Sequence, residues 1–298
     1  MRYYILLFCV IVSACGSPPI DYRGDNAAWF QQPQRQPGHR PVIAVALGSG
    51  GPRGLTHVGV LKALEANGIV PDLIVGTSSG ALVGSVYASG MPLREIESMA
   101  MDLQPKKFLD FSYSNRGYIR GAALQDFINR LVKGKHLEQL TKEFAAVSTD
   151  LKTGNAVIFN RGNTGLAVRA SSAIPGRFQP VTINGRDYLD GDLVSPVPMR
   201  IARELGADVV IGVDVSAYVE DTPLAKIFPV DWIVTGIMRK TMVGHEERFA
   251  DVLIHPNIGY YAGWDDAYKK RCFAAGERDT LAAIPKIKAA IAAAQKNM

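Results

Sequence analysis

Residues 75–84 read VGTSSGALVG and place Ser78 between two glycines, Gly76 and Gly80. The spacing Gly-x-Ser-x-Gly is that of a nucleophile elbow, in which the flanking glycines allow a sharp strand-to-helix turn to push the serine oxygen forward. Such a serine attacks the carbonyl carbon of an ester once a base removes its proton. The same pentapeptide also occurs as an ordinary loop of small residues, so these positions alone leave both interpretations open.

A second loop of small residues, GSGGPRG, occupies residues 48–54. It does not complete a dinucleotide-binding pattern, because the sixth residue of a run from Gly48 is Arg53, and the chain has no Gly-Lys-Ser or Gly-Lys-Thr of a phosphate-binding P-loop. At a helix N-terminus, the backbone N–H groups of such a loop stabilise a negatively charged oxygen. Next to a nucleophilic serine this oxygen is the oxyanion of acyl transfer. The candidate donors are Gly50, Gly51 and Arg53, since Pro52 has no N–H.

A nucleophilic serine needs a base, and the sequence offers two candidates. Asp190 and Gly191 follow a predicted strand that comes after an Asn184-Gly185 hairpin turn, although an Asp-Gly pair by itself usually marks only a turn. His255 follows the apolar run 252–254 and is the best-placed histidine for a Ser-Asp-His triad. His57 lies on a predicted helix face among apolar residues, and we expect it to be structural.

The elements around these loops predict an α/β fold. Residues 42–47 form an unbroken apolar run, which is typical of a parallel strand covered on both faces, and helical spacing begins at Leu55. A short strand at 73–75 precedes Ser78, and a helix is expected from Ser79 to about Ala88. Consecutive strand–turn–helix units place their strand ends side by side. The glycine loop and the serine loop are therefore expected to be neighbours.

These motifs, in this order, resemble the patatin-like phospholipase family. The resemblance rests on the glycine loop ending in Arg53-Gly54, on the elbow around Ser78 and on the later Asp190-Gly191, with family-like segments at 149–159 and 171–181. It covers residues 41–215 well and the C-terminal third only loosely. It implies an α/β fold of three layers, with a mostly parallel central sheet flanked by helices.

The resemblance also implies the chemistry. Ser78 would be the nucleophile and Asp190 its base, without a histidine, and the glycine loop would form the oxyanion hole. The structural positions of the motifs would be Gly54, Gly76, Gly80 and Gly191. The implied reaction releases fatty acids from membrane phospholipids or lysophospholipids. No cofactor or metal is implied, and the sequence contains no HExxH, paired Cys-x-x-Cys or Asp-rich calcium loop.

Two loops depart from the family pattern. In the glycine loop, Ser49 stands where many members have a glycine, and Pro52 stiffens the backbone, which leaves the exact set of oxyanion donors open. In the second loop, Asp192 follows Gly191 where glycine or alanine is common. Burial raises the pKa of a carboxyl group, and a second carboxylate nearby raises it further. We therefore expect burial to raise the pKa of Asp190, which makes it a better proton acceptor, and the Asp192 carboxylate either adds to this shift or points to solvent.

The N-terminus is typical of an export signal. Arg2 precedes a charge-free segment, residues 3–14, that is too short to span a bilayer. The signal ends in VSAC and resembles the lipobox of bacterial lipoproteins, which implies cleavage after residue 14 and lipid on Cys15. Gly16 follows in place of the aspartate that marks inner-membrane retention, so the resemblance implies the periplasmic face of the outer membrane. Residues 15–40, rich in Pro and Gln, are expected to form a flexible tether before a catalytic domain at 41–298.

Composition is that of a globular protein, with 298 residues, 47% of them hydrophobic and 20% charged. The net charge of +5 is spread along the chain and predicts no nucleic-acid groove. Cys272 would be the single free thiol of the mature chain, so no internal disulfide is expected. Residues 224–249 combine apolar residues with Arg239 and Lys240 and are interpreted as a core helix or as a lipid-facing lip, and the last helix is expected to break or begin at Pro285. A non-catalytic lipid-binding lipoprotein remains the alternative to an enzyme.

Overall fold

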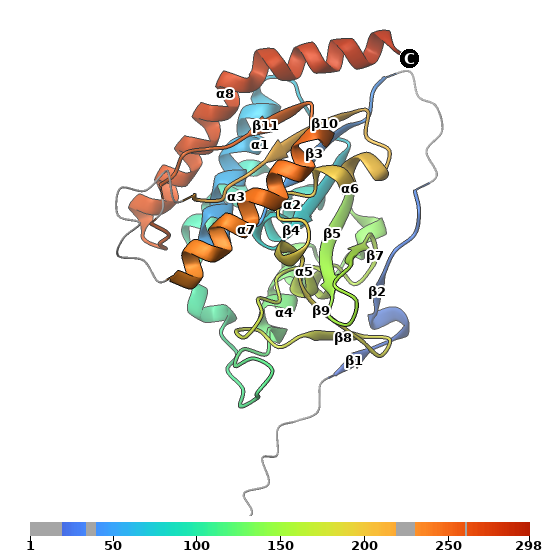
Figure 1. Ribbon diagram of the computed structural model, residues 1–298, viewed down its shortest axis with the longest axis vertical. Coiled ribbons are helices and arrows are strands. Elements are labelled where there is room, and N and C mark those ends of the chain that lie inside the picture. The colour runs from blue at the N-terminus through green and yellow to red at the C-terminus, as the bar shows by residue number, and fades with distance from the viewer. Residues whose placement is uncertain (1–19, 34–39, 219–229, 260) are drawn as a thin grey trace, which may run out of the picture.

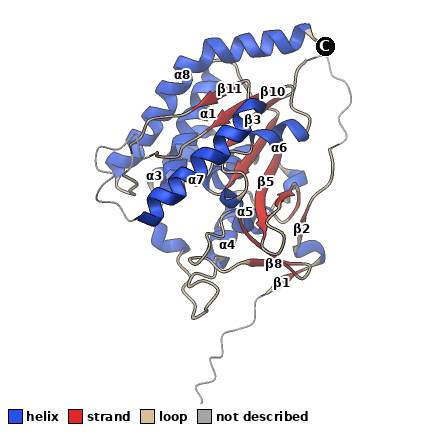
Figure 2. Ribbon diagram, in the orientation of Figure 1, coloured by secondary structure: helices blue, strands red, loops and turns tan. Residues whose placement is uncertain are grey.

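A mostly parallel sheet lies between two layers of helices (Figures 1 and 2). The computed structural model describes residues 20–33, 40–218, 230–259 and 261–298, without the side chains of residues 231 and 232. The predicted signal segment and Cys15 lie outside the described residues. The strand order is β1-β8-β9-β5-β4-β3-β10-β11, and β6 pairs with β5. Within these ranges no helix has the length and apolar content that crossing a bilayer requires.

The sheet consists of β1 (Asp21–Tyr22), β3 (Ile43–Leu47), β4 (Leu73–Thr77), β5 (Glu143–Asp150), β6 (Ala156–Phe159), β8 (Val181–Ile183), β9 (Arg186–Asp190), β10 (Val209–Val213) and β11 (Val252–Ile254). The helices are α1 (Thr56–Ala66), α2 (Ser79–Ala88), α3 (Leu93–Met101), α4 (Ala122–Leu131), α5 (Thr164–Ser171), α6 (Met199–Glu204), α7 (Val230–Glu246) and α8 (Asp266–Lys296).

Alternating side chains of the central strands build two separate cores. Ile43, Val45 and Leu47 of β3 pack with the helices α1 to α5 and α8. Ala44 and Ala46 face the other side, where α6 and Val243 near the end of α7 cover the sheet. Strands that are buried on both faces need the continuous apolar run seen at 42–47. The predicted three-layer α/β fold is confirmed.

The local predictions around the motifs are also confirmed. β3 and β4 are adjacent and parallel, with Leu47 paired to Gly76, and α2 begins and ends at the expected residues. Asn184 and Gly185 have φ values of 50° and 73°, as a two-residue hairpin turn between β8 and β9 requires. This hairpin positions β9, the strand that ends at Asp190.

The N-terminal segment is more ordered than predicted. β1 adds in parallel to β8 at the edge of the sheet, and β2 (Ala28–Trp29) pairs with β7 (Arg161–Gly162). Ala27 and Ala28 are buried. An edge strand offers unpaired backbone N–H and C=O groups, and even a short extended segment can pair with them. The prediction of a flexible tether is therefore wrong for residues 20–33.

The last helix does not break at Pro285. α8 continues from Asp266 to Lys296 and packs along α1, burying Cys272, Ile284 and Ile287. A proline inside a helix costs about 3 kcal/mol because it removes one backbone hydrogen bond and crowds the preceding turn. Burial of the apolar face of α8 on both sides of the proline outweighs this cost, since helix stability in proteins comes mainly from tertiary packing.

Candidate active site

Ser78 occupies a strained turn between β4 and α2. Its φ of 54° and ψ of −118° are unusual for a residue with a side chain. Such a conformation persists only where surrounding contacts hold it, and it is typical of functional positions. The Ser78 amide donates to Ser171 Oγ at 3.0 Å, and Ser171 Oγ donates to the carbonyl of Val147 at 2.6 Å. On the other side, Thr77 Oγ1 donates to the carbonyl of Ser195 at 2.8 Å.

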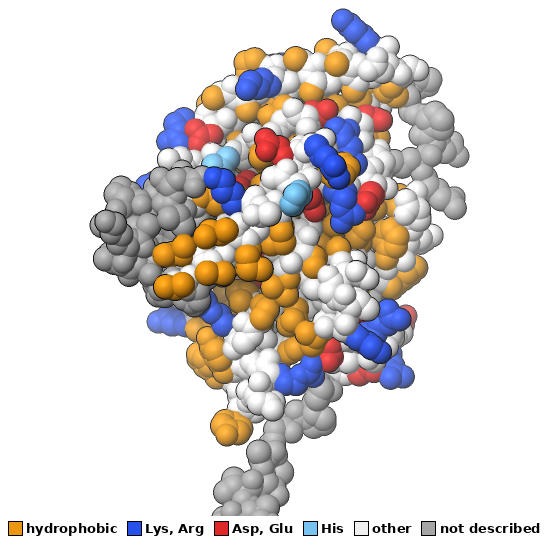
Figure 3. All heavy atoms as spheres, in the orientation of Figure 1, with side chains coloured by type: hydrophobic (Ala, Val, Ile, Leu, Met, Phe, Trp, Pro, Cys, Tyr) orange, Lys and Arg blue, Asp and Glu red, His pale blue; other side chains and the backbone are white. Residues whose placement is uncertain are grey.

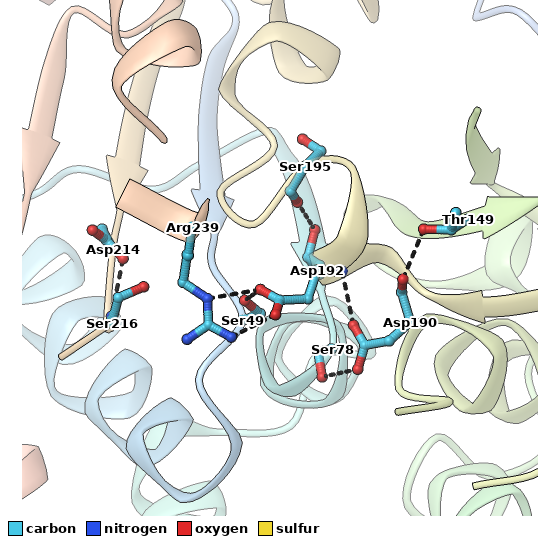
Figure 4. A network of polar contacts seen from close by, with 10 residues as sticks. Ser49, Ser78, Thr149, Asp190, Asp192, Ser195, Asp214, Ser216 and Arg239 are labelled. Carbon is cyan, nitrogen blue, oxygen red and sulfur yellow. Dashed lines mark hydrogen bonds and ion pairs between the residues drawn. The ribbon is translucent and has the colours of Figure 1, made fainter. Parts of the chain in front are cut away.

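The elbow brings the Ser78 hydroxyl to the carboxylate of Asp190. Ser78 Oγ donates to Asp190 Oδ2 at 2.8 Å (Figure 4). β5 lies between the strands that carry the two residues, because Thr77 pairs with Val147 and Ser148 pairs with Asp190. Both predicted residues are buried, with 7% of Ser78 and 3% of Asp190 exposed.

Burial is also the main influence on the Asp190 carboxyl group. Loss of hydration, together with the nearby negative charge of Asp192, raises the pKa of Asp190 to about 7. The backbone amide of Asp192, the Ser78 hydroxyl and the Arg239 guanidinium act in the opposite direction. The first of these is a hydrogen bond of 2.9 Å to Asp190 Oδ1. A carboxylate with this pKa accepts a proton far more readily near neutral pH than a solvated aspartate does.

Asp192 joins three parts of the site (Figure 4). Its backbone amide binds Asp190, its carboxylate accepts a hydrogen bond from Ser49 in the glycine loop, and the same carboxylate forms a two-pronged ion pair with Arg239 of α7. The distance from Arg239 Nε to Asp192 Oδ1 is 2.9 Å. Ser49 and Asp192, which both depart from the family pattern, therefore contact each other.

The glycine loop leaves two backbone amides available. The amides of Gly48 and Ser49 donate to the carbonyls of Val213 and Pro196, and a 3-10 turn (Gly51–Leu55) follows. The amide of Arg53, the third predicted oxyanion donor, donates to the carbonyl of Gly50 at 3.2 Å. The amides of Gly50 and Gly51 have no hydrogen-bond acceptor within the described parts of the chain. His57 supports this loop through a 2.8 Å contact between Nε2 and the Gly48 carbonyl, and burial lowers the pKa of His57 to about 4.

The loop and the elbow touch each other at positions where a side chain would not fit. A Cβ atom on Gly80 would lie 2.1 Å from the carbonyl oxygen of Leu47, and one on Gly54 would lie 2.4 Å from Ser79 Cβ. Cβ atoms on the other two motif glycines would meet backbone atoms, at Ala81 for Gly76 and at Val147 for Gly191. The glycines at these four predicted positions allow β3, β4, β5 and their loops to approach closely.

The model of the family described as patatin-like phospholipase matches residues 45–203, which include all three motifs and more than half of the chain. The chain belongs to the patatin-like phospholipase family. An uncharacterized NTE family protein of Mycobacterium tuberculosis is 40% identical over 179 residues, which cover 59% of this chain and 49% of that protein. The patatin-like phospholipase domain-containing protein 6 of Homo sapiens is 35% identical over 186 residues, 59% of this chain and 13% of that protein.

Two further comparisons are with a curated protein and with a solved structure. The protein named Lysophospholipase NTE1 of Coccidioides immitis is 32% identical over 192 residues, which cover 61% of this chain and 12% of that protein. The crystal structure of VipD from Legionella pneumophila has a similar fold, with a TM-score of 0.59, 14% sequence identity and coverage of 85% of this chain and 67% of that chain. The chain matches about half the length of the mycobacterial relative and a much smaller part of the other two curated relatives.

The contacts of His255 differ from those of a triad member in this patatin-like site. His255 Nδ1 lies 3.2 Å from Asp214 Oδ2 and 3.0 Å from the Asp214 carbonyl oxygen, and its ring stacks on Tyr218. Burial raises the pKa of Asp214, but hydrogen bonds and the charge of His255 outweigh burial and lower this pKa to about 2. The hydroxyl of Ser78 instead donates to Asp190.

Two residues that contact the patatin-like site were not predicted as part of it. Ser171 binds the Ser78 amide, and Arg239 binds Asp192. The sequence indicated Ser171 only through its place in the family-like segment 171–181. For Arg239, the sequence contained one indication of a partner. This residue lies in a mostly apolar helical stretch, and an arginine in such surroundings needs a carboxylate partner.

A cavity of about 350 Å³ lies at the opposite end of the sheet from Ser78. Its lining includes Leu73, Glu143 and Phe144, at the amino ends of β4 and β5, whereas Ser78 and Asp190 lie at the carboxyl end of β4 and beside the carboxyl end of β5. Across the described ranges, His, Cys, Asp and Glu side chains form no group of three or more suited to hold a metal ion.

Proposed function

We propose that this chain is a serine acyl hydrolase that releases fatty acids from phospholipids or lysophospholipids. The observation that carries the proposal is the 2.8 Å hydrogen bond from the strained Ser78 to the buried Asp190. Membership of the patatin-like phospholipase family, and similarity to a protein named lysophospholipase, supply the substrate class. The alternative of a non-catalytic lipid-binding protein gives no reason for this strained and buried pair.

In the first half of the proposed reaction, Ser78 Oγ attacks the carbonyl carbon of the ester while its proton moves to Asp190 Oδ2. The carbonyl oxygen becomes an oxyanion, which we assign to the amides of Gly50 and Gly51. Each such donor contributes about 100- to 1000-fold in rate. The tetrahedral intermediate collapses when Asp190 returns the proton to the leaving alcohol, and the fatty acyl group stays on Ser78.

In the second half, water attacks the acyl-enzyme and Asp190 again accepts a proton. The same oxyanion donors act on the second tetrahedral intermediate, and collapse releases the fatty acid and restores the Ser78 hydroxyl. The raised pKa of Asp190 suits a group that must accept a proton and return it in each half-reaction.

The direct test is mass spectrometry of the products released from a mixed lipid extract. We expect the wild-type chain to release fatty acids and to leave lysolipids or deacylated head groups, whose masses identify the substrate. Ser78→Ala, still folded, should release none above background, and folded Asp190→Asn should release no more than about 1% of the wild-type amount. Equal fatty-acid release by all three proteins contradicts the proposal.

His255 provides a test of the two-residue arrangement. If Asp190 alone serves as the base, His255→Ala should keep turnover of a soluble ester within about threefold of wild type, because its loss leaves the hydrogen bond from Ser78 to Asp190 in place. In a triad, removing the histidine costs several orders of magnitude. A loss of 1000-fold or more in a folded His255→Ala variant therefore favours the triad.

We also propose that the chain is a lipoprotein exported to the periplasmic face of the outer membrane and anchored through Cys15. In a bacterial host fed radiolabelled palmitate, the wild-type chain should incorporate label and fractionate with the outer membrane. Cys15→Ser should lose the label, whereas the control Cys272→Ser should keep it, because Cys272 is buried in α8. Labelled Cys15→Ser protein contradicts this anchor.

A further inference from the structure

Helix α7 turns charged side chains toward the protein and aliphatic side chains toward the outside, the reverse of an ordinary surface helix. Arg239 turns toward the protein and binds Asp192, and Glu246 accepts hydrogen bonds from Ser195 Oγ and the Arg200 amide. Spacings of four and three residues place Val230, Val234 and Ile237 on the side of the helix opposite Arg239. There the exposed fractions are 74%, 46% and 57%, and the neighbouring Met238 is 58% exposed. A helix with charged groups inside and aliphatic groups outside is suited to apolar surroundings.

A second exposed apolar element is the loop 109–118. It forms a narrow hairpin, in which Phe111 bridges Ile119 and the Ser112 amide donates to the Tyr118 carbonyl. Its aromatic side chains point outward, since Phe111 is 65% exposed, Tyr113 86% and Tyr118 48%. Figure 1 shows this segment projecting from the body of the protein below α7. In Figure 3, hydrophobic side chains cover both α7 and the region below it on one face.

The loop and the residues that flank it in the sequence carry more positive than negative charge. Residues 105–120 contain four basic residues, Lys106, Lys107, Arg116 and Arg120, and one acidic residue, Asp110. The Asp110 carboxylate accepts hydrogen bonds from the amides of Gly121 and Ala123 at the start of α4. Arg116 binds Asp187, whereas the side chains of Lys106, Lys107 and Arg120 make no hydrogen bond or ion pair with any described residue. These three cations remain available for an external anionic surface.

We propose that the loop 109–118 and the outer side of α7 (Val230, Val234, Ile237 and Met238) form a docking face for an anionic phospholipid bilayer. Aromatic side chains occupy the boundary between head groups and acyl chains, and lysines beside them attract anionic head groups. Protein interfaces, by contrast, are depleted in lysine. The choice of a bilayer as the partner rests on the proposed function. An active site beside the docking face would take its lipid substrate directly from the membrane.

α7 also links the docking face to the reacting groups. Its inner side contacts the 3-10 turn (Gly191–Leu193) and Ser195, the segment that directly follows Asp190, through Arg239 and Glu246. Leu193 in this turn is 46% exposed. The bilayer surface would therefore lie against the helix that covers the Asp190 turn.

Site-specific fluorescence tests this proposal. An environment-sensitive dye is attached to one introduced, exposed cysteine in the full chain, in a Ser78→Ala, Cys9→Ser, Cys15→Ser background that retains the buried Cys272. The docking-face sites are Tyr113→Cys and Ile237→Cys. The controls are Val70→Cys before β4 and Leu281→Cys on α8, which are also exposed, at 46% and 48%. Vesicles contain phosphatidylcholine, with or without phosphatidylglycerol, and a quencher attached to the lipid acyl chain.

On anionic vesicles we expect quenching at positions 113 and 237 of at least fivefold that at positions 70 and 281. Attachment through the N-terminal segment alone would bring all four sites to the vesicle without this contrast. Lys106→Gln with Lys107→Gln should reduce quenching at position 113 several-fold, whereas Lys286→Gln with Lys288→Gln on α8 should leave it unchanged. Equal quenching at the four sites, or none at 113 and 237, overturns the proposal. The proposal is also overturned if the wild-type chain forms a dimer in solution and the double variant Ile237→Ser, Met238→Ser is a monomer.

Catalysis is measured separately on the chain with Ser78. Phe111→Ser with Tyr113→Ser should lower fatty-acid release from anionic vesicles at least fivefold and keep turnover of a soluble short-chain ester within twofold. An equal fall on both substrates contradicts a docking role. Because the quenching experiment uses a chain without Ser78, docking without any lipid hydrolysis by the wild type would refute the proposed function and leave the docking face standing.

Discussion

Ser78→Ala is expected to lower ester turnover by at least about 10,000-fold, because it removes the atom that carries the acyl group. Asp190→Asn is expected to cost about 100- to 10,000-fold, since an amide cannot accept the serine proton. Neither change should unfold the protein. Ser78→Ala removes only a hydroxyl, and an asparagine at position 190 keeps the size of the side chain and an oxygen for the Asp192 amide.

The neighbouring carboxylate supplies a matched control. Asp192→Asn removes an acidic side chain two residues from Asp190 but keeps the backbone amide that binds Asp190 Oδ1. We expect it to reduce turnover by no more than about tenfold, since Asp190 would remain in place as the general base. Turnover of a soluble ester, with circular dichroism to verify folding, checks all three variants. A folded Asp190→Asn protein that keeps a tenth of wild-type turnover contradicts the role of Asp190 as base.

The second large effect is on the pH dependence of stability. The pKa of Asp190 is about 7 in the folded chain, against 3.8 for an ordinary aspartate, so the folded state holds more protons than the unfolded state between these pH values. The free energy of unfolding therefore falls as pH rises through this window and levels off above pH 7. We expect Asp190→Asn to remove a penalty of about 2–4 kcal/mol that the wild type carries at pH 8 and largely lacks at pH 4.

Urea unfolding of wild type and Asp190→Asn at several pH values between 4 and 8 measures this difference. Other titrating groups cancel between the two proteins, because both contain them. A difference in free energy of unfolding that does not change with pH contradicts the raised pKa.

The same group should set the acid limb of activity. Since Asp190 must be ionised to accept a proton, kcat/KM should rise with pH and reach half of its plateau near pH 7. Asp192→Asn removes a negative charge and should move this midpoint to lower pH. Arg239→Gln removes a positive charge and should move it to higher pH. Midpoints that do not move in these variants would show that another group limits the rate.

Much of the site could be predicted from sequence because its parts are local. The apolar run before Gly48 and the glycines around Ser78 specify two strand–turn–helix units. Glycine is required at positions 54 and 80 because backbone or side-chain atoms occupy the space of a Cβ. The Asn184-Gly185 turn likewise specifies the hairpin that ends at Asp190. Each of these signals depends on a few consecutive residues and on backbone sterics.

The resemblance of three spaced motifs to one family added the pairing of Ser78 with Asp190, which local patterns had left undecided between aspartate and histidine. The two residues are 112 positions apart, and their contact depends on the registers of β4, β5 and β9. Strand pairing over such distances depends on the whole sheet. No short stretch of sequence determines it.

The remaining features were decided by tertiary structure alone. Three features depend on distant partners: the Arg239–Asp192 ion pair, the pairing of residues 21–22 and 28–29, and the unbroken course of α8 through Pro285. Local propensity predicted a free tether and a broken helix, and the energy of pairing and burial exceeded it in both places. The sequence by itself determined which side chains could react. The packing of the three layers determined which of them contact each other and, through burial, the pKa of Asp190.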